Sequence, residues 1–194
     1  MAMKPEDILR LIAAERGDAI CVPTMTTSPA WRTLAPDDLS VGCVGFMGGA
    51  SSLGLGLALA HPERRVIVFD GDGSLLMQLG ALATNAGAGA RNFVHLLFKN
   101  NVYHTSGAQE IPGGDGVDFV MMAKGAGYRE AFAIHELPEL KRRLPHILSG
   151  DGPLFVQLHT TLADQTPMTA GMGVPFAKQV ETLRGRLLAL DTAR

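Results

Sequence analysis

The stretch that decides the fold covers residues 65–101 and reads RVIVFDGDGSLLMQLGALATNAGAGARNFVHLLFKNN. An apolar, β-branched run at 66–69 predicts a buried strand, and the Gly-Asp-Gly-Ser sequence at 71–74 predicts a tight turn. Residues 75–86 are expected to form one helix, and residues 93–98 a second buried strand that ends at the pair Asn100-Asn101. Ligands bind at the carboxyl ends of strands in an open parallel sheet. The sequence therefore predicts a β-turn-α-β unit with a binding site at its strand ends.

The 71–74 turn is open to three interpretations. In the first, Gly71 and Gly73 let the backbone approach a phosphate, while Asp72 and Asn101 supply oxygen ligands to Mg²⁺. In the second, the Asp-x-Asp-x-Ser pattern resembles haloacid-dehalogenase-type phosphatases, with Asp70 as the nucleophile. That pattern normally lies near the start of its domain and needs a later acidic pair, and no such pair follows here. In the third, the segment is an ordinary βα turn whose aspartates face solvent.

The spacing of the two polar motifs favours the first interpretation. Residues 74–99 separate the Gly-Asp-Gly triplet from the asparagine pair, which gives the pattern GDG-x26-NN. This pattern resembles the signature of the two-domain thiamine-diphosphate-dependent decarboxylases and synthases. The resemblance implies thiamine diphosphate and Mg²⁺ as cofactors. It also implies that Asp72, Asn101 and the main-chain carbonyl of Tyr103 bind the metal ion.

The same resemblance assigns further residues to the cofactor. It implies that Ser74 and the backbone of Gly71 and Gly73 hold the diphosphate, together with a hydroxyl from the loop after the first strand, for which Thr24 is the best-aligned candidate. The alternative for that loop is a Ser/Thr cap of the helix expected at 29–34.

Two positions upstream of the turn complete the predicted cofactor site. Met47 lies 25 residues before Asp72, where the family has a bulky apolar residue that bends the cofactor into a V shape. Gly45 matches the position whose carbonyl accepts a hydrogen bond from the 4′-amino group of the cofactor. Without this register, packing in the core would be the preferred interpretation of Met47.

Composition places the rest of the chain in one globular domain. The 194 residues are 46% hydrophobic and 19% charged, with a net charge of −2, so nothing indicates binding to nucleic acid or to an anionic membrane. No apolar run approaches the ~20 residues of a membrane-spanning helix, and the first ten residues, MAMKPEDILR, do not resemble a signal peptide. Cys21 and Cys43 are expected to be buried thiols, which favours a cytoplasmic location.

Strand and helix patterns alternate along the chain. This alternation predicts an α/β fold of three layers, α/β/α, with a mostly parallel central sheet. The resemblance implies that this is the thiamine-diphosphate-binding fold. Residues 1–194 are expected to form a single diphosphate-type binding domain, with 160–194 as a C-terminal arm and helix. That arm either packs on its own domain or grips a partner. Outside residues 65–101, helical patterns lie at 5–15, 48–60, 118–126, 136–148 and 176–190, and strand-like runs at 19–22, 128–134 and 154–158.

The loop after the asparagine pair is expected to shape a substrate pocket. Its sequence NNVYHTSGAQ is similar to a run in the split, β-type subunits of sulfopyruvate and phosphonopyruvate decarboxylases. His104 and Thr105 are the candidate catalytic residues, because they could meet a substrate carboxylate or move a proton. The alternative for a single loop histidine is an ordinary surface residue.

The resemblance also implies what the chain lacks. Thiamine-diphosphate enzymes use a glutamate from a separate pyrimidine-type domain to activate the cofactor, and this chain has room for one such domain. We therefore expect a subunit of a 2-oxo-acid decarboxylase, inactive alone and completed by an α subunit. It would form a homodimer or an α2β2-type assembly acting on a small 2-oxo acid. A thiamine-diphosphate-binding or regulatory domain without turnover is the alternative.

Overall fold

The central sheet is parallel throughout. The computed structural model describes residues 2–36, 38–162 and 174–192. Five strands lie in the order β1-β2-β3-β7-β6, and every neighbouring pair is parallel. Their bounds are β1 (Ile20–Pro23), β2 (Val66–Gly71), β3 (Phe93–Lys99), β6 (Glu130–Ile134) and β7 (Leu154–His159).

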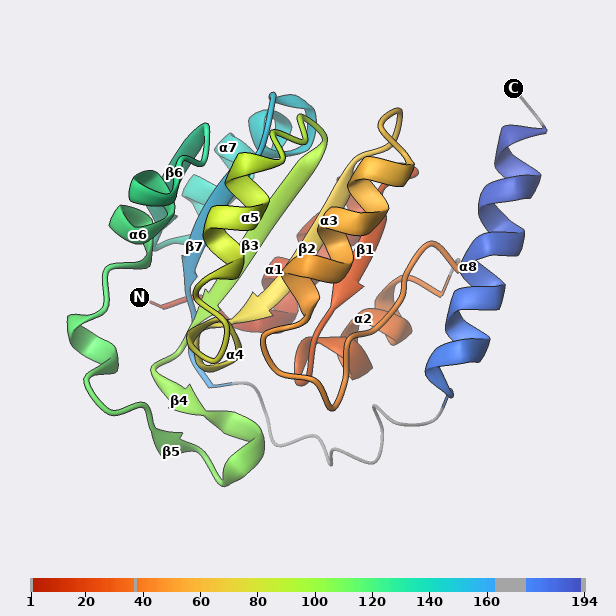
Figure 1. Cartoon of the computed structure of the whole chain (residues 1–194). Coiled ribbons are helices and arrows are strands. Elements are labelled where there is room, and N and C mark those ends of the chain that lie inside the picture. Colours follow the sequence, from red (N-terminus) through yellow and green to blue (C-terminus); the bar gives the residue numbers. More distant parts are fainter. Residues whose placement is uncertain (1, 37, 163–173, 193–194) are drawn as a thin grey trace.

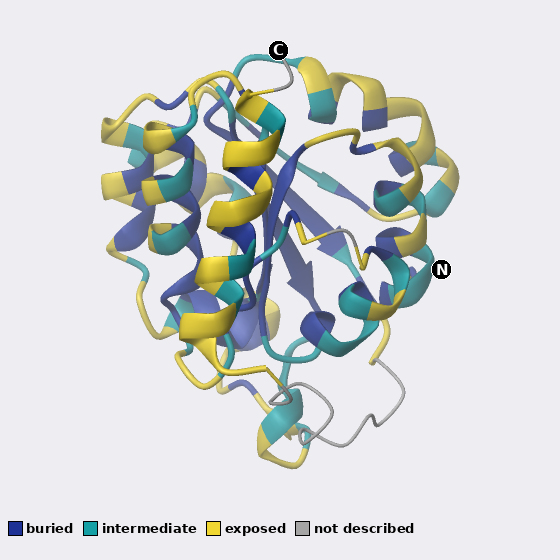
Figure 2. Ribbon diagram, turned by 90° about the vertical axis from the view of Figure 1, so that its right-hand side faces the viewer, coloured by how far each residue is buried: buried dark blue, intermediate teal, exposed yellow. Residues whose placement is uncertain are grey.

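Helices cover both faces of this sheet (Figure 1), because successive strand residues point to opposite sides. Along β2, Val66 and Val68 belong to one core cluster and Ile67 and Phe69 to the other. Apart from the edge strand β6, which is partly exposed, the strands are buried on both faces (Figure 2), so their sequences are mostly apolar. The first face packs against α3 (Ala50–Ala60), α5 (Ala81–Gly87) and α6 (Phe119–Ala126), and the second against α1 (Pro5–Glu15), α2 (Thr27–Leu34) and α7 (Leu137–Ser149). The predicted three-layer fold is confirmed.

The single helix predicted at 75–86 is wrong. The segment forms two short helices, α4 (Asp72–Leu76) and α5, separated by a turn. In that turn the backbone amides of Met77 and Gln78 donate to carbonyls three residues earlier, Ser74 at 3.1 Å and Leu75 at 3.0 Å. Gly80, which weakens a helix, precedes α5. The helix thus begins at Asp72 itself, inside the turn predicted from the glycines.

The loop after β3 folds into a small hairpin below the carboxyl ends of the strands (Figure 1). Strands β4 (Val102–Tyr103) and β5 (Gln109–Glu110) pair antiparallel, and the Ile111 amide donates to the carbonyl of Asn101 at 2.9 Å. Two 3-10 turns, η1 (His104–Ser106) and η2 (Gly114–Gly116), complete the loop. This hairpin presents Tyr103 and His104 to the sheet edge where the predicted site lies.

The C-terminal helix α8 (Phe176–Asp191) stands beside the β1 edge of the sheet (Figure 1). Leu183 and Leu187 join the core cluster of the first face. The buried guanidinium of Arg64 contacts the carboxylates of Asp18 at 2.6 Å and Asp191 at 2.7 Å. These contacts favour packing of the helix on its own domain, while residues 163–173 of the predicted arm lie outside the described residues.

Both cysteines, Cys21 and Cys43, are buried, as predicted. Burial raises the pKa of the Cys43 thiol to about 11. Within residues 2–36, 38–162 and 174–192, no helix combines the length and the apolar character needed to cross a bilayer.

Candidate functional site

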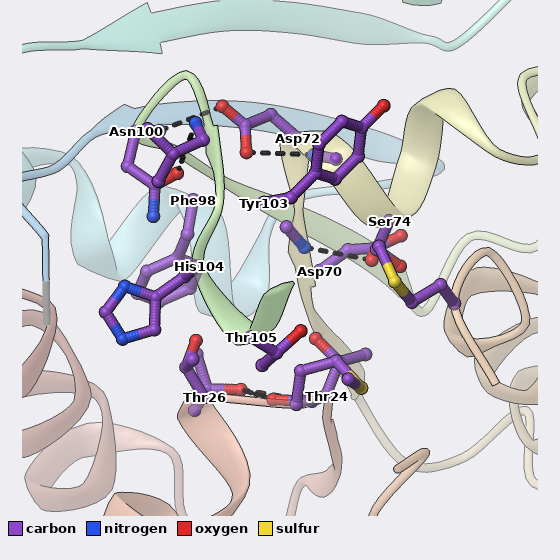
Figure 3. Close-up of a pocket in the computed structure, with 16 residues that line it drawn as sticks. Thr24, Thr26, Asp70, Asp72, Ser74, Phe98, Asn100, Tyr103, His104 and Thr105 are labelled. Atoms are coloured by element: carbon purple, nitrogen blue, oxygen red, sulfur yellow. Dashed lines mark hydrogen bonds between the residues drawn. The ribbon is translucent and has the colours of Figure 1, made fainter. Parts of the chain in front are cut away.

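A pocket opens at the carboxyl ends of β1, β2 and β3 (Figure 3). The threonines of the loop after β1 lie across it from Asp72 and Asn100, and His104 lies at one side. Every predicted site residue except Gly45 and Asn101 lines this pocket. The lining comprises Thr24, Met25, Thr26, Thr27, Met47, Asp70, Gly71, Asp72, Gly73, Ser74, Phe98, Asn100, Val102, Tyr103, His104 and Thr105.

Asp72 is the central acidic group of this pocket and is 2% exposed. Its Oδ2 accepts from the backbone amides of Asn100 at 2.9 Å and Asn101 at 2.6 Å, and its Oδ1 accepts from Gly73 at 2.9 Å. Burial raises the pKa of Asp72 above its ordinary value, although the three amides and the nearby Lys99 act in the opposite direction. The ionised carboxylate is therefore only partly compensated, and a cation beside it would be stabilised.

Asn101 contacts Asp72 through its backbone amide rather than through its side chain. Its φ of 62° lies in the left-handed region, and its amide is directed to Asp72. The side-chain Oδ1 accepts from the Lys99 ammonium, and Nδ2 donates to Asp115 Oδ1 at 2.6 Å. Asn100 lines the pocket in its place. Metal binding through Asn101 Oδ1 thus requires its contact with Lys99 to be exchanged.

The 71–74 turn is held by contacts from two directions. Ser74 Oγ accepts from the Gly48 amide at 2.9 Å, so its own proton can still be donated to a ligand oxygen. A Cβ at Gly73 would lie 2.6 Å from the ring of Tyr103, so only glycine permits this close approach. Gly48, which the sequence interpretation did not assign to the site, has a φ of +86°, and a Cβ there would meet Gln78 at 2.7 Å.

Thr24 lies in the pocket wall, but its hydroxyl already donates to the Phe69 carbonyl at 2.8 Å. The backbone amide of Thr24 donates to Thr27 Oγ1 at 3.0 Å, which fixes the start of α2. Thr26 and Thr27 also line the pocket, and the run of hydroxyl residues at 24–28 was the signal that could have predicted them.

Met47 and Gly45 lie differently, although they are two residues apart. Met47 is half-buried and lines the pocket. Gly45 is exposed, has a φ of +81° and is not among the lining residues. Its carbonyl assignment therefore rests on the family resemblance alone.

His104 and Thr105 reach the pocket from η1. The His104 Nδ1 atom is buried and has no hydrogen-bond partner among the described residues, so it can donate to or accept from a ligand.

Asp70 has a fully buried side chain whose oxygens accept from the Gly71 amide at 2.9 Å and contact His95 Nε2 at 3.2 Å. A carboxylate held in this way is not poised as a nucleophile, which argues against the phosphatase interpretation.

The donor set of the pocket fits a hard cation rather than a transition metal. No group of three or more His, Cys, Asp or Glu side chains that could hold a metal occurs in the described parts of the chain. The candidate ligands are oxygens from one carboxylate, one amide and one backbone carbonyl. Mg²⁺ is commonly bound by one or two carboxylates together with phosphate oxygens and water.

Comparison with known protein families gives one match that covers most of the chain. Residues 22–158 match the model described as thiamine pyrophosphate enzyme, C-terminal TPP binding domain. That range contains both polar motifs and the pocket, and it confirms the resemblance drawn from GDG-x26-NN.

Among similar curated proteins, a phosphonopyruvate decarboxylase of Streptomyces viridochromogenes is 38% identical over 176 residues, which is 90% of this chain and 43% of that protein. The sulfopyruvate decarboxylase subunit beta of Methanothermobacter thermautotrophicus is 40% identical over 115 residues, which is 59% of this chain and 58% of that protein. The chain thus spans about half the length of these curated relatives.

A solved structure supports the fold. The thiamine diphosphate-dependent 4-hydroxybenzoylformate decarboxylase of Rhodococcus jostii RHA1 aligns with a TM-score of 0.70 at 25% identity, covering 85% of this chain and 34% of that one.

Proposed function

We propose a function from the premise that this chain belongs to the family of thiamine pyrophosphate enzymes, through their C-terminal TPP binding domain. The chain is the diphosphate-binding part of a 2-oxo-acid decarboxylase of the sulfopyruvate or phosphonopyruvate type. The observation that carries this proposal is the buried, partly compensated carboxylate of Asp72, between the 71–74 turn and the asparagine pair. The names of the two curated relatives support the substrate class.

In this proposal the chain's own residues bind and orient the cofactor. The Ser74 hydroxyl donates to the diphosphate. Thr24 and the backbone of Gly71 and Gly73 hold it by close approach, since the amides of both glycines already donate to aspartates and the Thr24 hydroxyl donates to a backbone carbonyl. Asp72, Asn101 Oδ1 and the Tyr103 carbonyl hold Mg²⁺. Thiamine diphosphate, when bound, supplies the electron sink that decarboxylation of a 2-oxo acid requires.

The residues on the substrate side have different tasks. Met47 would support the bound cofactor from the pocket wall, and the Gly45 carbonyl would accept a hydrogen bond from its amino group. His104 and Thr105 are assigned as catalytic residues that bind the substrate carboxylate or move a proton. The unpartnered His104 Nδ1 supports this assignment, because it is buried at the pocket yet has no hydrogen bond among the described residues.

Completion of the site by a second polypeptide is part of the proposal. The curated relative named subunit beta supports a division into subunits. In that arrangement an α subunit supplies the activating glutamate, and two copies of each chain form the enzyme.

Calorimetry with thiamine diphosphate tests this function directly. We expect saturable binding that requires Mg²⁺, because the diphosphate and Asp72 are both anionic and need a shared cation. The titration is run with the chain alone and with a candidate α chain, with inorganic pyrophosphate and Mg²⁺ as the comparison ligand. Absence of Mg²⁺-dependent binding under both conditions would contradict the proposed function.

Met47→Ala tests the support of the bent cofactor. We expect kcat of the assembled enzyme to fall on the order of 10- to 100-fold, because small errors in the placement of reacting atoms are costly. Cofactor affinity should change much less, since the diphosphate contacts remain. Met47→Leu, which preserves side-chain bulk, is the matched control and should retain most activity. Unchanged kcat in Met47→Ala would remove Met47 from the site.

A further inference from the structure

A network of buried polar side chains leads from the pocket wall into the core of the first sheet face. Asp70 near the end of β2 and His95 on β3 are 1% and 0% exposed. His95 pairs in register with Val68, two residues before Asp70, so the two polar side chains share the face covered by α3, α5 and α6. Most residues buried on this face are apolar, so a carboxylate and an imidazole are unexpected there.

Four hydrogen bonds connect this network. The Gly71 amide donates to Asp70 Oδ1 at 2.9 Å, and His95 Nε2 lies 3.2 Å from Asp70 Oδ2. On the other side of the ring, His95 Nδ1 lies 3.1 Å from the Tyr128 hydroxyl, which accepts from Asn85 Nδ2 at 3.2 Å. The network thus extends from α5 to the first residue of the turn that presents Asp72.

The proton positions follow from the chemistry of the partners. Burial raises the pKa of Tyr128 well above its ordinary value, so this hydroxyl keeps its proton. Because Asn85 donates to the Tyr128 oxygen, the hydroxyl proton is directed to His95 Nδ1. A neutral imidazole that accepts at Nδ1 carries its proton at Nε2, where it donates to the Asp70 carboxylate. One tautomer therefore satisfies all four bonds.

This arrangement determines where the charge of Asp70 lies. Asp70 borders the same pocket as Asp72 and Ser74, so its carboxylate would repel a bound diphosphate if it were turned toward the pocket. Instead, Oδ1 accepts from the Gly71 amide and Oδ2 contacts His95, which directs the charge away from that ligand. The same contact orients the Gly71 amide, which is the first amide of the 71–74 turn.

We propose that His95, held as the Nε2-protonated tautomer by Tyr128, is a positioning residue for the diphosphate-binding turn. It keeps the Asp70 carboxylate on the Gly71 amide and away from the diphosphate. The part concerning the diphosphate rests on the proposed function, while the tautomer and the Gly71 contact do not.

Four variants separate positioning from general stability. His95→Leu removes both ring contacts, and we expect affinity for thiamine diphosphate with Mg²⁺ to fall about 10-fold or more, as for other residues that orient direct ligands. His95→Gln, whose amide can still donate to Asp70, should restore most of that affinity. Tyr128→Phe should weaken binding less than His95→Leu. Phe155→Leu is the control, because the ring of Phe155 packs against the His95 ring, with 5.2 Å between their centroids, and makes no hydrogen bond to it. This substitution should lower the melting temperature but not the affinity for the cofactor.

Nuclear magnetic resonance provides a readout that needs no cofactor. Long-range ¹H–¹⁵N spectra should show His95 protonated at Nε2 only, and the Gly71 amide resonance should move in His95→Leu but remain near its position in His95→Gln and Phe155→Leu. A protonated Nδ1, or a Gly71 resonance unmoved in His95→Leu, would overturn the proposal. So would equal affinity losses in His95→Leu and Phe155→Leu. If the unsubstituted chain binds no cofactor, the proposed function fails, while the spectra still decide the role of His95. Should His95→Leu not fold, Tyr128→Phe and His95→Gln carry the same comparison.

Discussion

Asp72→Ala is expected to abolish Mg²⁺-dependent binding of thiamine diphosphate. Asp72 is the one carboxylate proposed as a metal ligand, and without it the diphosphate loses the cation that links it to the protein. Substitution of residues that only orient metal ligands costs 10- to 100-fold in affinity, so loss of a direct ligand should cost at least about 100-fold. Titration calorimetry of the variant at several Mg²⁺ concentrations measures this loss. Affinity equal to that of the unsubstituted chain would exclude Asp72 as the metal ligand.

Asp72→Asn removes the charge of this residue and keeps one of its two acceptor oxygens. Burial raises the folded-state pKa of Asp72, so the ionised form is disfavoured in the fold, and its contribution to stability declines as pH rises through that pKa. The asparagine amide is uncharged, but it keeps only one acceptor oxygen, so its NH2 group would face one or two of the backbone amides that now donate to Asp72. We therefore expect Asp72→Asn to lose Mg²⁺ binding. In the absence of metal and cofactor its melting temperature at neutral pH should change little, because removal of a buried charge offsets the lost acceptor. A large drop in melting temperature would instead indicate that the carboxylate serves mainly the fold.

The sequence predicted the sheet well because its strands are buried on both faces. The run at 66–69 is continuously apolar, the run at 93–98 is apolar except for His95, and both lie within β2 and β3. The polar residues that follow them come together because parallel strands end at one edge. Composition and spacing therefore sufficed to predict that Asp72 and the asparagine pair meet, as the bonds from Asn100 and Asn101 to Asp72 show.

Details that depend on side-chain direction could not be predicted in this way. The spacing places Asn101 beside Asp72, but its positive φ turns the side chain toward Lys99 and Asp115. The contact of Asp70 with His95 depends on the register between β2 and β3, which no local pattern specifies. A histidine inside the apolar run at 93–98 was the one visible sign of it. The break after α4 likewise could not be predicted, because the composition of the segment favours a helix. It depends on backbone amides that donate to the carbonyl three residues earlier instead of four.

The isolated chain is expected to bind its cofactor without catalysing decarboxylation. In the described part of the chain, no glutamate lines the pocket, and the activating carboxylate of the proposed mechanism is a glutamate. Phe46, adjacent to Met47, is 66% exposed, and exposed apolar residues near a site often mark an interaction surface. The exposed Phe46 supports the proposal that a second polypeptide completes the pocket.

Release of CO₂ from sulfopyruvate and from phosphonopyruvate measures this expectation, first with the chain alone and then with a purified chain of pyrimidine-type domain. We expect no turnover above background in the first case. In the second, activity should appear together with tighter cofactor binding, because the cofactor then contacts both polypeptides. Replacing the activating glutamate of the added chain by glutamine is the matched control, and it should remove activity while preserving assembly. Full decarboxylation by the isolated chain would refute the half-site proposal. Cofactor binding without turnover in any combination would favour the alternative of a binding or regulatory domain.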